Sequence, residues 1–172
     1  MIRLEPLTGR HDRNGFDCGV EVLNVWLKQT ALQHQGKGIS RSFVAVPADE
    51  SAVQSWAKSG YPVQASSILG FYTLTSAFVL TEGLPAQQSR RYPRQIPVTR
   101  LGRLATRSDM QDQGLGRLLL ADAVNRDRTA AQAVGSAGLF VDAKNEAAAR
   151  FYRRYGFTPC ADQPLKLFLS LW

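Results

Sequence analysis

The sequence is poor in the residues that build disulfide frameworks or metal sites. Only two cysteines, Cys18 and Cys160, occur in 172 residues, and neither has a cysteine or histidine near it at a metal-ligand spacing. A disulfide scaffold and a zinc site are therefore excluded. We expect both thiols to be plain buried groups and no metal to be bound.

Long apolar runs are also missing. The longest one, Ile68 to Leu80, contains Thr73, Thr75 and Ser76 and is too short to span a bilayer. Arg3 and Glu5 lie within the first strand-like segment, so no signal peptide is visible. We expect a cytoplasmic protein without a membrane partner.

Internal repeats and low-complexity tracts are absent, and 44% of the residues are hydrophobic. A chain of this length and composition can bury a sizeable core without dividing. The sequence therefore predicts a single domain over residues 1–172.

Acidic residues are scarce in one half of the chain. Residues 1–89 carry seven basic and seven acidic side chains, whereas residues 90–172 carry fourteen and seven, so the second half holds the whole net charge of +7. Between Glu82 and Asp109 no acid interrupts a run of six arginines, Arg90, Arg91, Arg94, Arg100, Arg103 and Arg107. Arginine suits bidentate phosphate contacts, so the run favours a nucleic-acid partner over a solvated face that only aids solubility.

The hydrophobic pattern predicts a mixed α/β sheet. Strands are expected at Ile2–Leu4, Ser42–Val46, Ser67–Leu80, Pro97–Thr106, Leu139–Val141 and Pro164–Leu171. A helix should begin near Val20, a second should bury Leu115, Leu118, Leu119 and Ala123, and a third should cover Asn145 to Tyr155, with Gly156 as its C-cap. The segment from Pro47 to Ala65 is expected to be a loop or a partly ordered insertion.

The run Gln111-Asp112-Gln113-Gly114-Leu115-Gly116 follows an expected strand and opens an amphipathic helix. Glycine lets the backbone approach a ligand closely, and the free N–H groups of a helix start favour an anion such as a pyrophosphate. The spacing is neither the three-glycine dinucleotide fingerprint nor the P-loop. By itself, this run is equally compatible with an ordinary turn.

Together with Asn145-Glu146-Ala147-Ala148-Ala149-Arg150-Phe151-Tyr152-Arg153-Arg154-Tyr155-Gly156-Phe157, the glycine loop resembles the two halves of the acetyl-CoA site of GNAT-type N-acetyltransferases. The chain also resembles one branch, the TacT-type toxins of toxin-antitoxin pairs, which acetylate aminoacyl-tRNA. Four segments carry this narrower likeness: Phe16–Gly19 with Leu23-Asn24, Gly70–Leu74, Arg103–Ala105 and Val141–Lys144. The insertion at 51–66 departs from the compact pattern of that branch.

The resemblance implies a GNAT fold, in which a central, mostly antiparallel twisted sheet is flanked by helices and a splayed strand pair holds acetyl-CoA. The residues implied in cofactor binding are Leu104, Ala105, Thr106, Gln111, Asp112, Gln113, Gly114, Leu115, Gly116, Arg117, Leu118, Asn145 and Phe151. Tyr152 is implied as the catalytic residue, with its phenol near the thioester sulfur. The tRNA contacts would be Arg90, Arg91, Arg94, Arg150, Arg153 and Arg154, with Tyr92 stacking on a terminal nucleotide.

Asn145 and Tyr152 could each have a purely structural role instead. Asn145 can cap its helix, which is compatible with a cofactor contact, and Tyr152 can be a core aromatic. No strong protein base is required, because an α-amine with a pKa of about 8 is partly neutral at pH 7, unlike a lysine with a pKa of about 10.4. His11 and His34 lie outside the motifs and are expected at the surface.

The implied partners are aminoacyl-tRNA, a ribbon-helix-helix antitoxin, operator DNA through the antitoxin complex, and a second copy of the chain. Two rival functions remain open. One is a GNAT enzyme that acetylates a protein or a small-molecule amine. The other is a module that binds CoA and a partner without turnover.

Overall fold

The computed structural model describes all residues 1–172. Its strands form a seven-stranded sheet in the order β1-β2-β3-β4-β5-β7-β6. The β1–β2, β5–β7 and β6–β7 pairs are antiparallel, and the β4–β5 pair is parallel. The strands are β1 Ile2–Pro6, β2 Arg41–Pro47, β3 Gly70–Leu80, β4 Gln95–Thr106, β5 Gly138–Asp142, β6 Thr158–Cys160 and β7 Gln163–Ser170.

Six α-helices and two short 3-10 helices connect the strands. They are α1 Glu21–Gln29, α2 Ala31–Gly36, α3 Glu50–Lys58, η1 Thr81–Gly83, α4 Ala86–Ser89, η2 Ser108–Met110, α5 Leu115–Ala131 and α6 Glu146–Arg154. The expected mixed, mostly antiparallel α/β architecture is therefore confirmed. No helix combines the length and the apolar composition that crossing a membrane would need.

The chain forms two compact units. Unit 1 comprises Met1–Thr73 and Arg103–Asp122, and unit 2 comprises Leu74–Gly102 and Ala123–Trp172. The chain passes between them within β3, β4 and α5. Each unit has its own hydrophobic core.

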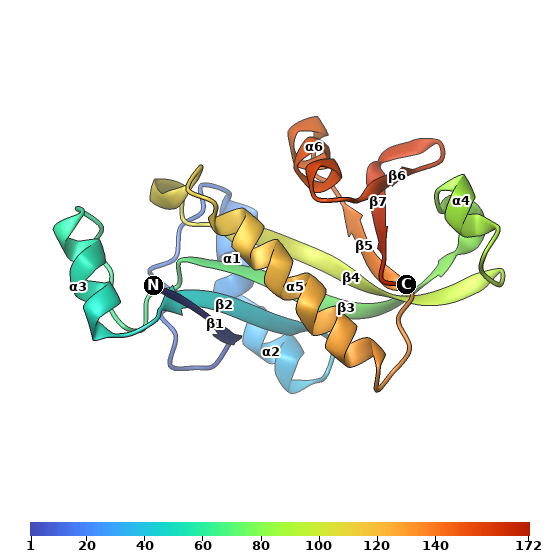
Figure 1. The fold of residues 1–172 in the computed structure, drawn as a ribbon. Coiled ribbons are helices and arrows are strands. Elements are labelled where there is room, and N and C mark those ends of the chain that lie inside the picture. The colour runs from blue at the N-terminus through green and yellow to red at the C-terminus, as the bar shows by residue number, and fades with distance from the viewer. The chain divides into compact units, whose positions relative to one another are not determined.

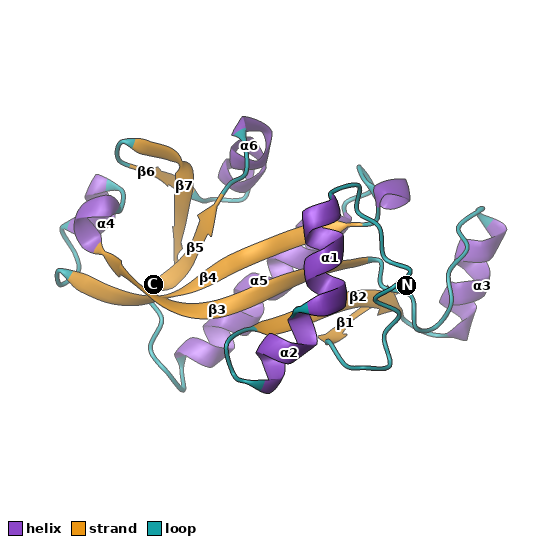
Figure 2. Ribbon diagram, turned by 180° about the vertical axis from the view of Figure 1, so that it is seen from behind, coloured by secondary structure: helices purple, strands orange, loops and turns teal.

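In unit 1, helices α1 and α2 lie on one face of the sheet and α5 starts on the other, as the opposite views in Figures 1 and 2 show. The core joins α1 to the strands through aromatic rings. Trp26 of α1 stacks on Phe71 of β3 with 6.3 Å between ring centroids, and Phe16 meets Phe71 edge-on at 5.5 Å. Each ring buries a large apolar area, so these contacts fix α1 against β3.

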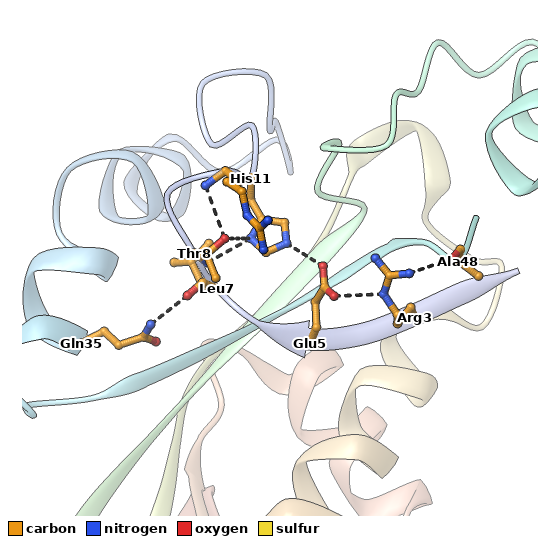
Figure 3. A network of polar contacts seen from close by, with 8 residues as sticks. Arg3, Glu5, Leu7, Thr8, His11, Gln35 and Ala48 are labelled. Atoms are coloured by element: carbon orange, nitrogen blue, oxygen red, sulfur yellow. Dashed lines mark hydrogen bonds and ion pairs between the residues drawn. The ribbon is translucent and has the colours of Figure 1, made fainter. Parts of the chain in front are cut away.

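The segment after β1 is fixed by a polar network around His11 (Figure 3). The His11 Nδ1 accepts a hydrogen bond from the Thr8 N–H at 3.0 Å, so Nε2 carries the proton that reaches Glu5 at 2.8 Å. Burial opposes ionisation of Glu5, but hydrogen bonds from His11 and Arg3 outweigh it and lower the pKa of Glu5. The expected surface position of His11 is wrong, because its side chain is only 8% exposed.

The second histidine is partly exposed. His34 is half-buried, and its ring meets Trp26 edge-on at 6.0 Å.

Unit 2 packs β3, β4, β6 and β7 around a core that includes Leu84, Ile96, Val98, Cys160 and Phe168. A Cβ at Gly138 of β5 would lie 2.1 Å from the Leu169 carbonyl oxygen, so only glycine fits there. Both cysteines are buried and free, as predicted. Burial raises the pKa of the Cys160 thiol to about 11, which keeps that thiol protonated.

The structure differs from the predictions made from the sequence at four points. The segment expected to be a loop contains α3, which Asp49 caps by accepting a hydrogen bond from the Ala52 N–H at 2.8 Å. The first helix breaks at Thr30 into α1 and α2, and the short strand β6 was not expected. Leu118, expected to face inward, is 39% exposed, whereas Leu120 is buried.

Candidate functional site

The glycine loop lies in unit 1, directly before α5. Asp112 and Gly114 have left-handed backbone conformations, with φ of 64° and 82°. The first bond of the helix ladder joins the Leu118 N–H to the Gly114 carbonyl at 3.2 Å, so the preceding N–H groups at the helix start have no acceptor within the helix. The loop therefore presents donors and the positive end of the α5 dipole to an anion.

The Asp17–Gly19 turn holds the loop on one side. The Gln111 side chain donates a hydrogen bond to the Cys18 carbonyl at 3.4 Å, and the Ser108 N–H donates to the Asp17 carbonyl at 2.9 Å. One N–H of the Gln111 amide is thus engaged with the protein, and its side-chain oxygen and its backbone remain for a ligand.

That turn is itself built by Asp17 and the buried Asn24 of α1. The Asp17 carboxylate accepts hydrogen bonds from the Gly19 N–H at 2.8 Å and the Asn24 amide at 2.9 Å, which lower the pKa of Asp17. The Asn24 oxygen in turn accepts from the Cys18 N–H at 3.0 Å. The segment Phe16–Gly19 with Leu23-Asn24, the first of the four on which the resemblance to TacT-type toxins rests, therefore supports the glycine loop.

The strand before the loop has an open stretch. The parallel register of β4 with β5 ends at the Leu101–Val141 pair, although β4 continues to Thr106. Ala105 is packed closely, because a Cβ at Gly70 would lie 3.0 Å from its carbonyl oxygen and 2.9 Å from Leu119 Cδ1. Strand β4 thus offers peptide groups of residues 104–106 for pairing with an extended ligand.

Helix α6 of unit 2 carries the second motif. Asn145 caps it, with its side-chain oxygen accepting from the Ala148 N–H at 2.9 Å, and Gly156 ends it at φ 97°. The capping alternative for Asn145 is therefore confirmed, and its amide group remains able to donate to a ligand.

Tyr152 is the central aromatic residue of α6. It is 8% exposed and packs between Phe151, at 5.2 Å and nearly edge-on, and Phe157, at 5.4 Å. Burial raises the pKa of Tyr152 to about 12. The phenol therefore stays protonated at neutral pH and can act as a hydrogen-bond donor.

The arginine run divides into two groups. Arg100 pairs with Asp142, Arg107 pairs with Asp109 at 2.7 Å, and the Arg103 guanidinium lies 3.8 Å from the Trp26 ring centroid. These three are bound within the protein. Arg90, Arg91 and Arg94 are exposed and take part in none of the ion pairs, although the Arg91 guanidinium lies 5.8 Å from the Tyr92 ring centroid.

Two other residues expected to contact tRNA, Tyr92 and Arg153, are also engaged with neighbouring side chains. Tyr92 is half-buried against the unit 2 core, and its hydroxyl lies 3.2 Å from Ser170 Oγ, so its ring is not a free stacking platform. Arg153 pairs with Glu146 at 2.8 Å, which lowers the pKa of that glutamate. Arg150 and Arg154 on the same helix are exposed.

The sequence reasoning missed two residues beside the glycine loop. Trp56 of α3 lines a cavity with Gly114, Leu115 and Leu118, and Tyr61 accepts a hydrogen bond from the Gln113 side chain at 2.6 Å. Two aromatic residues five apart in a segment otherwise rich in Ser, Ala and Gln were the available signal.

Comparisons with known proteins agree on one family. The Acetyltransferase (GNAT) domain family matches residues 75–159. A tRNA-acetylating toxin of Mycobacterium tuberculosis is 31% identical over 160 residues, covering 93% of this chain and 86% of the toxin. A probable toxin TacT of Sinorhizobium fredii is 26% identical over 178 residues, covering 98% of this chain and 90% of that protein.

Solved structures extend the similarity to complexes. AtaT complexed with acetyl-methionyl-tRNAfMet has a TM-score of 0.83 and 31% identity, covering 99% of this chain and 95% of AtaT. AtaT bound to the C-terminus of the antitoxin AtaR and acetyl-CoA has a TM-score of 0.74 at 31% identity, covering 98% of this chain and 92% of that one. The KacTA–DNA complex matches with a TM-score of 0.74 at 33% identity, covering 99% and 93%.

Proposed function

Since the chain belongs to the TacT-type branch of the GNAT N-acetyltransferases, which use acetyl-CoA, we propose that it is a toxin that acetylates the α-amino group of aminoacyl-tRNA and thereby blocks translation. The observation that carries the choice of acceptor is the similarity, over 99% of the chain, to AtaT complexed with acetyl-methionyl-tRNAfMet. We also propose that residues 1–172 are a single acetyltransferase domain.

The residues of the glycine loop fit the pyrophosphate of acetyl-CoA. The left-handed Asp112 and Gly114 turn the backbone so that the N–H groups from Gly114 to Arg117 can point at one anion, whereas the Leu118 N–H is taken by the Gly114 carbonyl. The peptide groups of Leu104, Ala105 and Thr106 would pair with the pantetheine arm, and the free amide of Asn145 would donate to it. Phe151, whose ring contacts Tyr152 at 5.2 Å, would border the thioester end.

Tyr152 would stabilise the departing thiolate of CoA while the amine attacks the thioester carbonyl. Complete transfer of a proton from a phenol with a pKa of about 12 to a thiolate whose thiol has a pKa of about 8.5 is uphill by roughly 5 kcal/mol. A hydrogen bond from the phenol, which builds up as negative charge develops on sulfur, is therefore the favoured role. Structures of tyrosine-to-phenylalanine variants of both AtaT and KacT exist, which makes a tyrosine a residue of interest in those relatives.

The exposed basic side chains would hold the acceptor. Arg90, Arg91 and Arg94 adjoin α4, and Arg150 and Arg154 lie on α6 with Arg153 beside them. Guanidinium groups bind phosphate in bidentate fashion, and an RNA backbone offers a phosphate at every nucleotide. The absence of an ion pair at the first three residues supports this assignment, because no protein carboxylate must be displaced.

The relatives also indicate what controls the activity. AtaT has been solved with the C-terminus of its antitoxin, and KacTA with DNA. We extend this to a cognate antitoxin of the ribbon-helix-helix type, a repressor complex on operator DNA and a homodimeric toxin. A short adjacent reading frame with the ribbon-helix-helix pattern would support the first point, and sedimentation of the pure protein tests the last.

The decisive experiment is to incubate the protein with charged total tRNA and labelled acetyl-CoA, then to identify nuclease-released aminoacyl-adenosine by mass spectrometry. We expect N-acetylated aminoacyl-adenosine. A label that appears only on a protein lysine or a small amine would instead support the general acetyltransferase, and no turnover despite CoA binding would support a binding module.

A further inference from the structure

Helix α3 and the segment that follows it, the insertion named above, contact the glycine loop. Tyr61 lies three residues beyond the end of α3, and its hydroxyl oxygen accepts a hydrogen bond from the Gln113 side chain at 2.6 Å. Gln111, two residues earlier, donates to the Cys18 carbonyl at 3.4 Å. The loop is therefore held on two sides, by one glutamine to the turn before α1 and by the other to the insertion.

Trp56 reinforces this contact from within the insertion. Its ring meets Tyr61 edge-on, with 5.4 Å between centroids and 89° between planes, which fixes the orientation of the tyrosine. It also lines a cavity of about 100 Å³. The other residues that line the cavity are Ile2, Met110, Gln113, Gly114, Leu115 and Leu118.

The loop needs such support because little else holds it. Asp112, Gln113 and Gly114 are all exposed, and two of these three residues adopt left-handed backbone conformations. A non-glycine residue such as Asp112 is strained there, so a free loop would leave this conformation readily. Fixing it before the ligand arrives removes an ordering cost from binding.

We propose that Trp56 and Tyr61 are positioning residues for acetyl-CoA, which hold the Gln111–Gly116 loop in its anion-binding conformation through the Tyr61–Gln113 hydrogen bond, with Trp56 packed against Tyr61. This inference rests on the proposed function, because it presumes that the loop binds the pyrophosphate. It makes the insertion part of the cofactor site. Neither residue needs to touch the ligand.

Titration calorimetry with CoA on the full chain tests the proposal. Tyr61→Phe keeps the ring and removes the hydroxyl, so it should weaken CoA binding about fivefold, the change that one net hydrogen bond of about 1 kcal/mol gives. Gln113→Leu should do the same, and the double variant should bind CoA no more weakly than either single variant. Additive losses would overturn the hydrogen bond as the cause.

Kinetics separate positioning from a general loss of structure. For Tyr61→Phe we expect a higher KM for acetyl-CoA with an unchanged kcat, together with faster amide exchange at residues 111–116 and an unchanged Tm. Trp56→Ala should raise the same KM further. Gln54→Ala, on the exposed side of α3, is the matched control and should bind CoA like the unaltered chain.

The outcomes distinguish this proposal from the one on which it rests. If the unaltered chain binds CoA and Tyr61→Phe binds it equally well, the positioning role is wrong and the acetyltransferase assignment stands. If the unaltered chain does not bind CoA at all, both are wrong. A parallel fall in kcat, Tm and affinity in Tyr61→Phe would also contradict positioning, because it would show a merely structural role.

Discussion

The guanidinium of Arg103 lies 3.8 Å from the centre of the Trp26 ring, in the geometry of a cation–π contact between β4 and α1. Trp26 in turn stacks on Phe71. Arg103 is thus part of the support of unit 1, although in the sequence it stands in the middle of a basic run. The arginines that serve an external anion have to be sought among those that the fold leaves exposed.

The pair Arg91 and Arg94 should therefore contribute to RNA binding alone. Replacing both with alanine should weaken tRNA binding and lower the slope of log Kd against log salt by about 1.4 to 1.8, because two phosphate contacts are lost. Affinity for acetyl-CoA should not change. Arg10→Ala with Arg41→Ala removes two exposed arginines of unit 1 and serves as the control in the same filter-binding assay. Equal losses of tRNA and CoA affinity would refute the assignment.

Tyr152→Phe should bind acetyl-CoA normally and lose transfer by about 10²-fold or more, since it removes only the hydrogen-bond donor. Turnover on charged tRNA, with CoA binding by calorimetry, measures both quantities. Tyr155→Phe is the matched control, because Tyr155 is the C-cap residue of the same helix and contacts Phe151 at the same 5.2 Å as Tyr152 does. Undiminished turnover in Tyr152→Phe would remove this residue from the mechanism.

Asp127 should make stability depend on pH. This carboxyl is 1% exposed, and burial raises its pKa above the usual 3.8, against the opposing hydrogen bonds from Thr99 and Ser136. The folded state therefore favours the protonated form, so the stabilisation is complete below the ordinary pKa and is lost as pH rises through the raised one.

Asp127→Asn cannot ionise, and it should lose that part of the pH dependence and be at least as stable as the unaltered chain at neutral pH. Thermal melts from about pH 4 to about pH 8 measure this difference. Asp162→Asn, at an exposed position, should retain the original profile. Parallel profiles for Asp127→Asn and the unaltered chain would show that Asp127 does not cause the effect.

Gly138→Ala should destabilise unit 2 severely. The added Cβ would lie 2.1 Å from the Leu169 carbonyl oxygen and 2.8 Å from the Phe168 ring, so β5 and β7 would have to separate. Overpacking of this kind costs about 1–3 kcal/mol or more, which denaturant unfolding detects easily. Gly135→Ala, whose Cβ would meet nothing closer than 4.0 Å, should unfold almost like the unaltered chain.

The sequence predicted α6 well because a capping residue marks each of its two ends. Asn145 caps the start and Gly156 supplies the left-handed residue at the end, and each cap can be recognised from a few neighbouring residues in the sequence. Helix α3 was missed because its interior is rich in Ser, Ala and Gln, and it buries only Ala52 fully. Its N-cap Asp49 was present in the sequence, but the apolar face that follows is limited to Ala52, Val53 and Trp56.

The sequence predicted only those parts of the candidate site whose residues are contiguous in the chain. The loop and α6 were found, whereas the contacts that hold the loop join residues far apart, Gln113 with Tyr61 and Gln111 with Cys18. The same limit applies to charge. A linear run of arginines does not reveal which of them will fold onto Trp26 or pair with Asp142.

The end of the β4–β5 register at Leu101 and Val141 has a consequence for how the protein responds to its surroundings. Beyond that pair, β4 continues with peptide groups that β5 does not satisfy, and an unsatisfied strand edge accepts any extended chain. A ligand that binds there only in the folded state raises the unfolding free energy by RT ln(1 + [L]/Kd). If acetyl-CoA pairs with this edge, as proposed, the thermal stability of this acetyltransferase would rise with the concentration of its own acetyl donor, and the folded fraction would report the acetyl-CoA supply.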